Sequence, residues 1–186
     1  GCSEHYLAHI LRDCTAFVPE LDIVAVHDGR IVGNVMHVKA LIQGDDGETY
    51  EVLSLGPISV LPKYQRMGIG GQMIEYARKK AKDLGFRAIL LCGDPDYYSK
   101  KGFIPAQTLG IRTADNQYMA ALQACELYEG ALSKITGRYH EDSIYLVDEQ
   151  LVSQFDEQFP EKEKVAGTPS QKRFEQIAQM VFPANA

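Results

Sequence analysis

The sequence VLPKYQRMGIGG, residues 60–71, decides how this chain is interpreted. It joins a run of β-branched residues, typical of a strand, to a run with the apolar spacing of a helix. Three glycines in its last four positions let backbone N–H groups converge on an anion, and the start of a helix adds free donors and a positive dipole end. We therefore expect a phosphate or pyrophosphate site here, with Gln65 and Arg66 as side-chain donors at its mouth.

The glycines also have a purely structural interpretation, because a tight turn before a closely packed helix needs small residues as well. The sequence contains neither GxxxxGK[ST] nor GxGxxG, which excludes a P-loop and disfavours a dinucleotide-binding fold. The position of the loop between a strand and an amphipathic helix favours the anion site.

The residues around this loop predict a mixed sheet. Three runs rich in β-branched residues, separated by turn sequences, indicate an antiparallel meander. These runs are residues 21–26, 30–42 and 49–60. Helical spacing over 72–84 and a continuous apolar run over 86–92 then predict a crossover to a parallel strand. Since Pro donates no ladder hydrogen bond, Gly56-Pro57 should bulge the third strand or splay it from a neighbour, which would free backbone groups for a ligand.

The remaining elements are predicted from shorter signals. A helix capped by Ser3 opens the chain, residues 95–101 form a short helix closed by Gly102, and strands are expected at 117–128 and 143–147. Residues 148–164 are acidic with helical spacing, and Thr168-Pro169 begins a terminal helix that should bury three apolar side chains. These are Phe174, Ile177 and Val181.

The predicted fold class is therefore α/β (α+β): a mixed, twisted sheet with a splayed central strand, flanked by helices. We assign residues 1–147 to one domain and residues 148–186 to a C-terminal helical extension.

Composition and charge limit the function classes. The chain has 186 residues, is 45% hydrophobic and carries a formal charge of −6, so its overall field gives no reason to expect nucleic-acid or anionic-membrane binding. The longest apolar run, 88–92, is far shorter than the roughly 20 residues of a membrane helix. The four cysteines form no CxxC pair, which argues against a metal site and favours a reducing, cytoplasmic location.

Two motifs together resemble the GNAT family of N-acetyltransferases. Gln-x-x-Gly-x-Gly, residues 65–70, is similar to the acetyl-CoA signature of that family. After the next predicted strand, Tyr98 stands four residues before Gly102-Phe103, as in the family's second motif. The two motifs occur in the right order and at about the right distance, and the resemblance covers residues 21–105. It is strongest to a bacterial subgroup of predicted acetyltransferases.

The resemblance implies roles for particular residues. The strand residues Ile58, Ser59 and Val60 would pair with the pantetheine arm of acetyl-CoA through their backbone. Tyr98 would act as the general acid that protonates the departing thiolate, whereas Tyr97 lies one position off the pattern and is expected to pack. Lys101 is a candidate contact for the CoA phosphates, with a solvated surface lysine as the alternative. Backbone amides would hold the pyrophosphate; they belong to Arg66, Met67, Gly68, Ile69, Gly70 and Gly71.

The general base is the residue that the sequence does not identify. Some protein-acetylating members of the family carry a Glu on the central strand, and the corresponding position here is Ser54. Glu51 or Asp94 is the substitute carboxylate, and His37 on the preceding strand is a further candidate. Each also has an ordinary structural interpretation: a solvated strand residue, a helix N-cap and a cavity histidine.

The resemblance implies direct acetyl transfer from acetyl-CoA to an amine of a small molecule or a protein, without a metal. The alternative is a non-catalytic acyl-CoA-binding sensor or interaction module, favoured by the missing base. The family normally places a strand and a helix before the point where this chain starts, so we expect part of the domain to lie upstream of Gly1. An exposed sheet edge and the C-terminal extension make a homodimer a further expectation.

Overall fold

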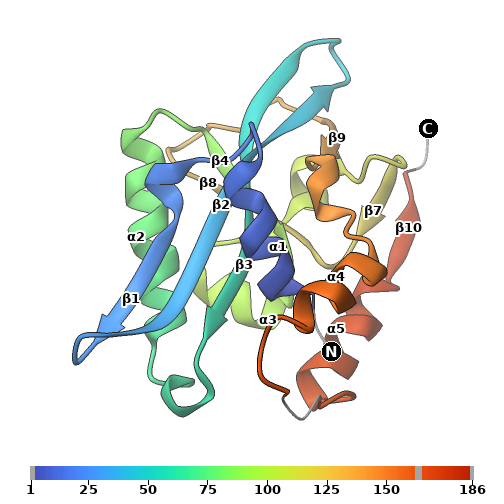
Figure 1. The fold of residues 1–186 in the computed structure, drawn as a ribbon. Coiled ribbons are helices and arrows are strands. Elements are labelled where there is room, and N and C mark those ends of the chain that lie inside the picture. The colour runs from blue at the N-terminus through green and yellow to red at the C-terminus, as the bar shows by residue number, and fades with distance from the viewer. Residues whose placement is uncertain (1–2, 162–164, 185–186) are drawn as a thin grey trace.

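The computed structural model describes residues 3–161 and 165–184. In this part of the chain, eight strands form one mixed sheet in the order β5-β8-β4-β3-β2-β9-β6, with β1 paired to β2 (Figure 1). β3 pairs with β4 and β6 with β9 in parallel, and the remaining pairs are antiparallel. The strands are β1 (Ile23–His27), β2 (Arg30–Gly44), β3 (Thr49–Val60), β4 (Ala88–Cys92), β5 (Ile104–Pro105), β6 (Ile111–Arg112), β8 (Leu122–Glu126) and β9 (Gly137–His140). The predicted meander, crossover and mixed sheet are confirmed.

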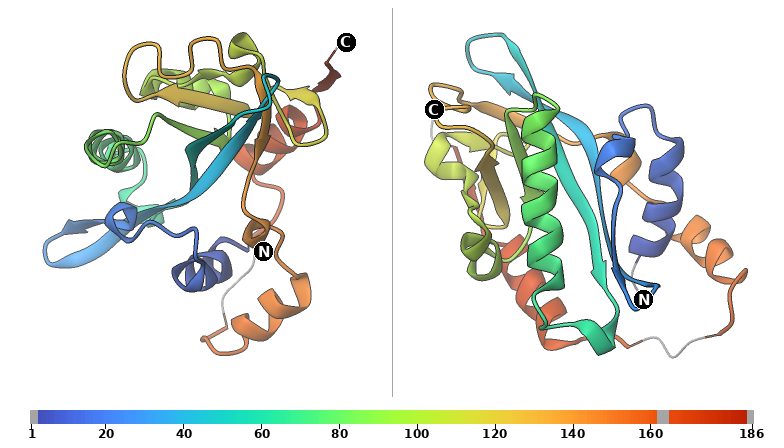
Figure 2. Two further views of the ribbon diagram at one scale, coloured as in Figure 1. Left: turned by 90° about the horizontal axis from the view of Figure 1, so that it is seen from above. Right: turned by 90° about the vertical axis from the view of Figure 1, so that its left-hand side faces the viewer.

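Two helices cover opposite faces of the sheet (Figure 2). On one face α2 (Ile69–Asp83) packs Met73 and Ile74 against Leu53 and Ile89. On the other, α1 (Glu4–Ile10) packs Leu7 against alternate residues of β2. Because successive side chains of a strand point to opposite faces, a single strand contributes to both cores. Short 3₁₀ turns connect the elements: η1 (Leu11–Asp13), η2 (Pro19–Leu21), η3 (Pro62–Tyr64) and η5 (Ala106–Leu109).

The central strands separate part-way along their length. The parallel register of β3 and β4 comprises Leu53 with Ile89 and Ser54 with Leu90. Beyond it comes the cis peptide bond Gly56–Pro57, opposite which the register of β2 and β3 shifts. β3 then resumes pairing with β2 over 58–60. The side of β3 that faced β4 is therefore left without that partner, as the Gly-Pro pair predicts.

The region after β4 agrees in part with the elements predicted from the sequence. The short helix is observed as α3 (Pro95–Tyr98) continued by η4 (Ser99–Lys101), and Gly102 ends it with φ +83°. The run 117–128 is not one strand: it contains β7 (Gln117–Met119) and β8, separated by a turn.

The strand predicted over 143–147 is wrong. The segment begins with η6 (Ser143–Tyr145), because the Asp142 side chain caps it by accepting a hydrogen bond from the Ile144 N–H. Ile144, Tyr145 and Val147 pack against the α1 side of the sheet instead of extending it. The strand at this edge is β9, which ends just before the segment.

The C-terminal residues contact the rest of the fold at three places. α4 (Glu149–Asp156) places Phe155 against the rings of His5 and His9 on α1. Arg173 on α5 (Pro169–Ala178) forms ion pairs with Asp94 and Asp96 beside α3. β10 (Val181–Pro183) pairs with β7 in a two-stranded sheet. This extension is therefore fixed to the rest of the fold near both α1 and α3.

The details of α5 correct the sequence prediction. The helix starts with a capping box between Thr168 and Gln171, as its sequence suggests. Ile177 is buried as expected, but Phe174 is 41% exposed. Val181 lies beyond the helix, where pairing with Met119 of β7 determines its conformation. Among the described residues, no helix combines the length and apolarity required to cross a bilayer.

Two isoleucines test how the core is divided. Ile89 is fully buried between β3, β8 and α2, whereas Ile31 at the start of β2 is 63% exposed. Ile89→Ala should lower the free energy of unfolding by about 2–5 kcal/mol through the cavity it leaves. Ile31→Ala should cost less than about 1 kcal/mol, mainly through strand propensity. Urea denaturation measures both, and equal losses would contradict this assignment of the core.

Candidate active site

The loop between β3 and α2 presents backbone donors at the end of the helix. Gly68 is the N-cap of α2 with φ +85°, and Arg66 also has a positive φ of 63°. The helical hydrogen bonding begins with the Gln72 N–H, which donates to the Gly68 carbonyl at 3.0 Å. The N–H groups of residues 69–71 therefore lie in the first turn, where a helix has no backbone acceptors for them. This is the arrangement that binds phosphate.

The side chain of Gln65 is exposed and also bonds within its own loop. Its Nε2 donates to the Val60 carbonyl at 3.0 Å and so ties the loop back to the end of β3. Because an amide nitrogen carries two N–H groups, a ligand-binding role for this residue stays a prediction beside this structural one. Arg66 and Met67 are exposed beside it.

The glycines at the start of α2 leave space that other side chains occupy. A Cβ on Gly70 would lie 3.1 Å from the Tyr97 hydroxyl oxygen, and one on Gly71 would lie 2.5 Å from the Lys101 Nζ. Lys101 therefore brings its ammonium group directly to the N-terminal turn of α2. The structure places this predicted residue with the glycine loop, as binding of an anion there requires.

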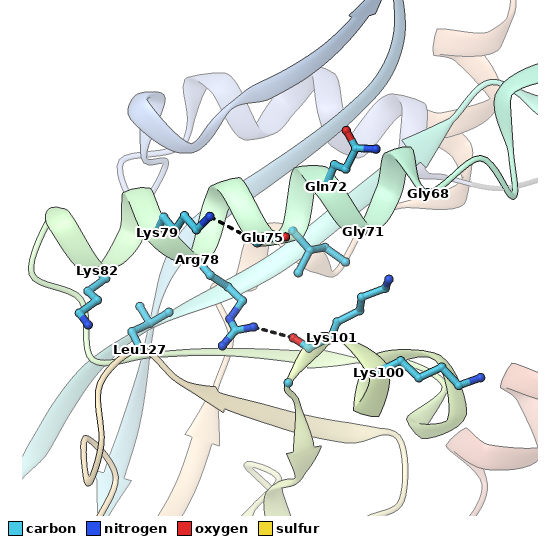
Figure 3. Close-up of a pocket in the computed structure, with 12 residues that line it drawn as sticks. Gly68, Gly71, Gln72, Glu75, Arg78, Lys79, Lys82, Lys100, Lys101 and Leu127 are labelled. Carbon is cyan, nitrogen blue, oxygen red and sulfur yellow. Dashed lines mark hydrogen bonds and ion pairs between the residues drawn. The ribbon is translucent and has the colours of Figure 1, made fainter.

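A groove of about 620 Å³ continues from this point between α2 and η4 (Figure 3). Its charged lining residues are Glu75, Arg78, Lys79, Lys82, Lys100 and Lys101. Glu75 is paired with Lys79 at 2.8 Å, and Arg78 holds the two walls together by donating to the Lys101 carbonyl at 2.8 Å. The groove is thus strongly cationic although the whole chain is acidic. Sequence reasoning missed these residues apart from Lys101, although Arg78 and Lys82 show the four-residue spacing of one helix face.

Tyr98 lies on the α2 side of the opening between β3 and β4. Its ring packs edge-on against Phe103 and Tyr97, and a side chain on Gly93 at the end of β4 would collide with it. Burial, with a smaller contribution from Tyr97, raises the pKa of Tyr98 to about 12. The hydroxyl therefore stays protonated at neutral pH, as a proton donor must.

On the other side of the opening, a carboxylate from a distant segment meets the central strand. Glu141, directly after β9, accepts hydrogen bonds on Oε1 from the Ser54 Oγ at 3.0 Å and from the Tyr139 Oη at 3.2 Å. Nearby, the Tyr145 hydroxyl donates to the Gly56 carbonyl at 2.9 Å. Sequence reasoning missed Glu141 because it stands 87 positions from Ser54, outside both motifs.

The structure places the two carboxylates named from the sequence in other interactions. Glu51 lies on the opposite face of β3 from Ser54 and forms an exposed ion pair with Lys39 at 3.3 Å. Asp94 caps α3 by accepting from the Asp96 N–H at 2.9 Å, and it also faces Arg173.

The comparisons with known proteins agree with this geometry. Residues 2–103 match the sequence model described as the Acetyltransferase (GNAT) family. The chain belongs to this family. Acetyl-CoA is the acetyl donor of GNAT enzymes.

Two relatives from Escherichia coli strain K12 are named as uncharacterized N-acetyltransferases. YhbS is 30% identical over 142 residues, which are 75% of this chain and 82% of YhbS. YjhQ is 31% identical over 100 residues, or 53% of this chain, and the match spans about half of YjhQ, 54%.

Two solved GNAT structures contain the coenzyme. Escherichia coli YhbS in complex with CoA has a TM-score of 0.70 at 27% identity, with 78% of both chains covered. A GNAT acetyltransferase from Brucella melitensis in complex with acetyl-CoA has a TM-score of 0.60 at 26% identity, with 77% of this chain and 78% of that chain covered.

His37, the third candidate base, is fully buried. Its Nδ1 lies 3.1 Å from the Leu21 carbonyl, which fixes Nδ1 as the protonated nitrogen, and burial lowers its pKa from 6.5 to about 4. Because the pKa of His37 is lower in the folded state than in the unfolded state, protonation favours the unfolded state. The free energy of unfolding is therefore highest above pH 6.5 and decreases as the pH falls toward 4.

The variant His37→Asn tests whether His37 makes stability depend on pH, since Asn keeps an N–H donor and does not titrate. Between pH 7.5 and 4.5 the wild type should lose about 2 kcal/mol more unfolding free energy than the variant. Urea denaturation at both pH values gives the difference, and parallel losses would show that His37 does not contribute.

Proposed function

We propose that this protein is an acetyl-CoA-dependent N-acetyltransferase that transfers an acetyl group directly to a primary amine of a small molecule, peptide or protein. The observation that carries the proposal is the continuity of the site. The unpaired edge of β3 leads from the opening after Ser54 to Val60, then to the first turn of α2 and into the cationic groove. An extended molecule with a thioester at one end and phosphates at the other fits that path.

Each part of the path suits one part of acetyl-CoA. The backbone of 58–60 offers ladder hydrogen bonds to the amides of the pantetheine arm, as an added strand would. The N–H groups of residues 66–71 and the Lys101 ammonium suit the pyrophosphate. Arg78, Lys82 and Lys100 of the groove supply further positive charge for the remaining phosphate.

The reaction that this site supports requires no nucleophilic residue. The acceptor amine attacks the thioester carbonyl, and the carbon–sulfur bond breaks when the tetrahedral intermediate collapses. Tyr98, which is protonated and packs on the α2 side of the sheet, gives its proton to the departing thiolate. A binding module without activity would need only the loop and the groove. A requirement for Tyr98 therefore distinguishes an enzyme from a binding module.

Gly68→Asp tests the coenzyme site. Acetyl-CoA should raise the melting temperature of the wild type, and the aspartate should abolish this rise by repelling the pyrophosphate. The matched control is Gly47→Asp in the turn between β2 and β3, because Gly47 also has a positive φ, +88°, and lies at the far end of these strands. Both variants carry similar backbone strain, so a loss of binding confined to Gly68→Asp locates the coenzyme at the loop. Equal binding by both variants would contradict the site.

Tyr98→Phe tests catalysis. With acetyl-CoA and an amine acceptor, release of free CoA thiol should fall about 100-fold in kcat while the KM for acetyl-CoA changes little. Tyr128→Phe, an exposed tyrosine remote from both motifs, is the control and should match the wild type. If Tyr98→Phe kept full activity, another group would be the acid. If the folded wild type bound acetyl-CoA but released no thiol with any amine, the binding-module interpretation would replace the enzyme.

A further inference from the structure

A group of polar side chains lies where β3 and β4 separate. Ser54 and Leu90 are the last paired residues of the two strands, and Ser54 is 1% exposed. Its hydroxyl donates to Glu141. Glu141 follows β9, which pairs with the edge of β2 opposite to β3. The carboxylate thus meets β3 at Ser54, the position that corresponds to the family's central-strand Glu, but it comes from the residue after β9.

Two donors hold the Glu141 carboxylate in place. Ser54 and Tyr139 both bind Oε1, and the described part of the chain places no donor on Oε2. Glu141 itself is exposed. One oxygen is therefore fixed while the other retains its capacity to accept a proton from an incoming group.

The carboxylate and Tyr98 approach the opening from opposite faces of the sheet. Tyr98 packs against the core beneath α2, together with Leu53 and Leu91. Ser54 follows Leu53 in β3 and so points to the other face, where η6 and α1 lie. A thioester between the strands would have the proton donor on one side and a carboxylate on the other. This is the arrangement that direct transfer to an amine requires.

We propose that Glu141 is the general base of this transferase and that Ser54 and Tyr139 are positioning residues for it. This inference rests on the proposed function. Glu141 takes one proton from the acceptor ammonium and passes it to solvent. The freed nitrogen lone pair bonds to the carbonyl carbon, the carbon–sulfur bond breaks, and the electron pair leaves on sulfur. Sulfur receives a proton from Tyr98, which regains one as the amide nitrogen loses its second proton. The products are the N-acetyl amine, CoA thiol and one proton.

The two tyrosines and the cysteine around Glu141 stay protonated when it would act. Burial raises the pKa of Tyr139, Tyr145 and Cys92, the last to about 12, and Glu141 adds to each shift. The other titratable groups nearby are His140 and Asp142 beside it in the chain and Cys14, which faces Tyr145. Asp142 is engaged as the cap of η6. The uncharged thiol of Cys92 also makes a cysteine nucleophile unsuitable at this position.

The test compares Glu141→Gln with the wild type in a thiol-release assay. The acceptors are spermidine, tyramine, Nα-acetyllysine and a tripeptide with a free N-terminus. At pH 7, Glu141→Gln should lower kcat/KM about 100-fold or more for whichever acceptor the wild type uses. Glu149→Gln, an exposed carboxylate in the first turn of α4, is the matched control and should leave activity unchanged. Stabilisation by acetyl-CoA checks that each variant is folded with its coenzyme site intact.

The pH profile separates a base from a merely structural residue. With Glu141 present, the bound ammonium can be deprotonated in the site, so kcat/KM should change little between pH 7 and 9. In Glu141→Gln only amine that is already neutral reacts. With an amine pKa near 10, its kcat/KM should then rise about tenfold per pH unit and approach the wild type at high pH. A uniform loss at every pH would overturn the assignment as a base.

The remaining outcomes are distinct. Full activity in Glu141→Gln with an active wild type would refute the base and leave the proposed function standing. A wild type that binds acetyl-CoA but acetylates none of the four acceptors would refute both the assignment of Glu141 as base and the proposed function. If Glu141→Gln does not fold, Ser54→Ala is the second variant. Loss of the donor that positions the carboxylate should lower kcat about tenfold while the KM for acetyl-CoA stays unchanged, and an unchanged kcat would overturn the proposal.

Discussion

Parallel pairing between β3 and β4 covers two residue pairs and then ends, and the rest of the site depends on that interruption. A buried strand normally satisfies its backbone groups on both sides, so a strand that loses one neighbour must find another partner. Pro57 makes continued pairing unfavourable because it has no N–H group to donate. β3 nevertheless stays in the sheet, because β2 pairs with it on both sides of the Gly56–Pro57 bond. The result is an open edge inside a rigid sheet, suited to an extended ligand.

The electrostatics of the molecule are local rather than global. The formal charge of −6 would by itself disfavour an anionic ligand. Around the start of α2, however, the helix end, the glycine loop and Lys101 concentrate positive potential, and cations predominate among the charged residues that line the groove. Screening limits the reach of distant surface carboxylates to about 10 Å, so the nearby cations dominate at the groove.

The proposed catalytic groups come from parts of the chain that have no sequence relationship to one another. Tyr98 follows β4, Ser54 belongs to β3, and Glu141 follows β9. β9 reaches the site because it pairs with β2 over 137–140, and the turn capped by Asp142 then directs the chain toward α1. The hydrogen bond between Ser54 and Glu141 joins β3 to the residue that follows β9, although β2 lies between these two strands in the sheet.

The sequence by itself determined the parts of this protein that depend on near neighbours in the chain. The meander, the crossover helix, the interruption at Gly56-Pro57 and the helix starting at Thr168 all follow from periodicity, proline chemistry and capping, which act over a few residues. The glycine loop belongs to the same class, since its glycines and the helix they begin are contiguous. Only the tertiary structure decided where the side chains of Arg173 and Glu141 lie. Pairing between strands far apart in the chain sets those positions, and no local pattern encodes which side chains such pairing brings together.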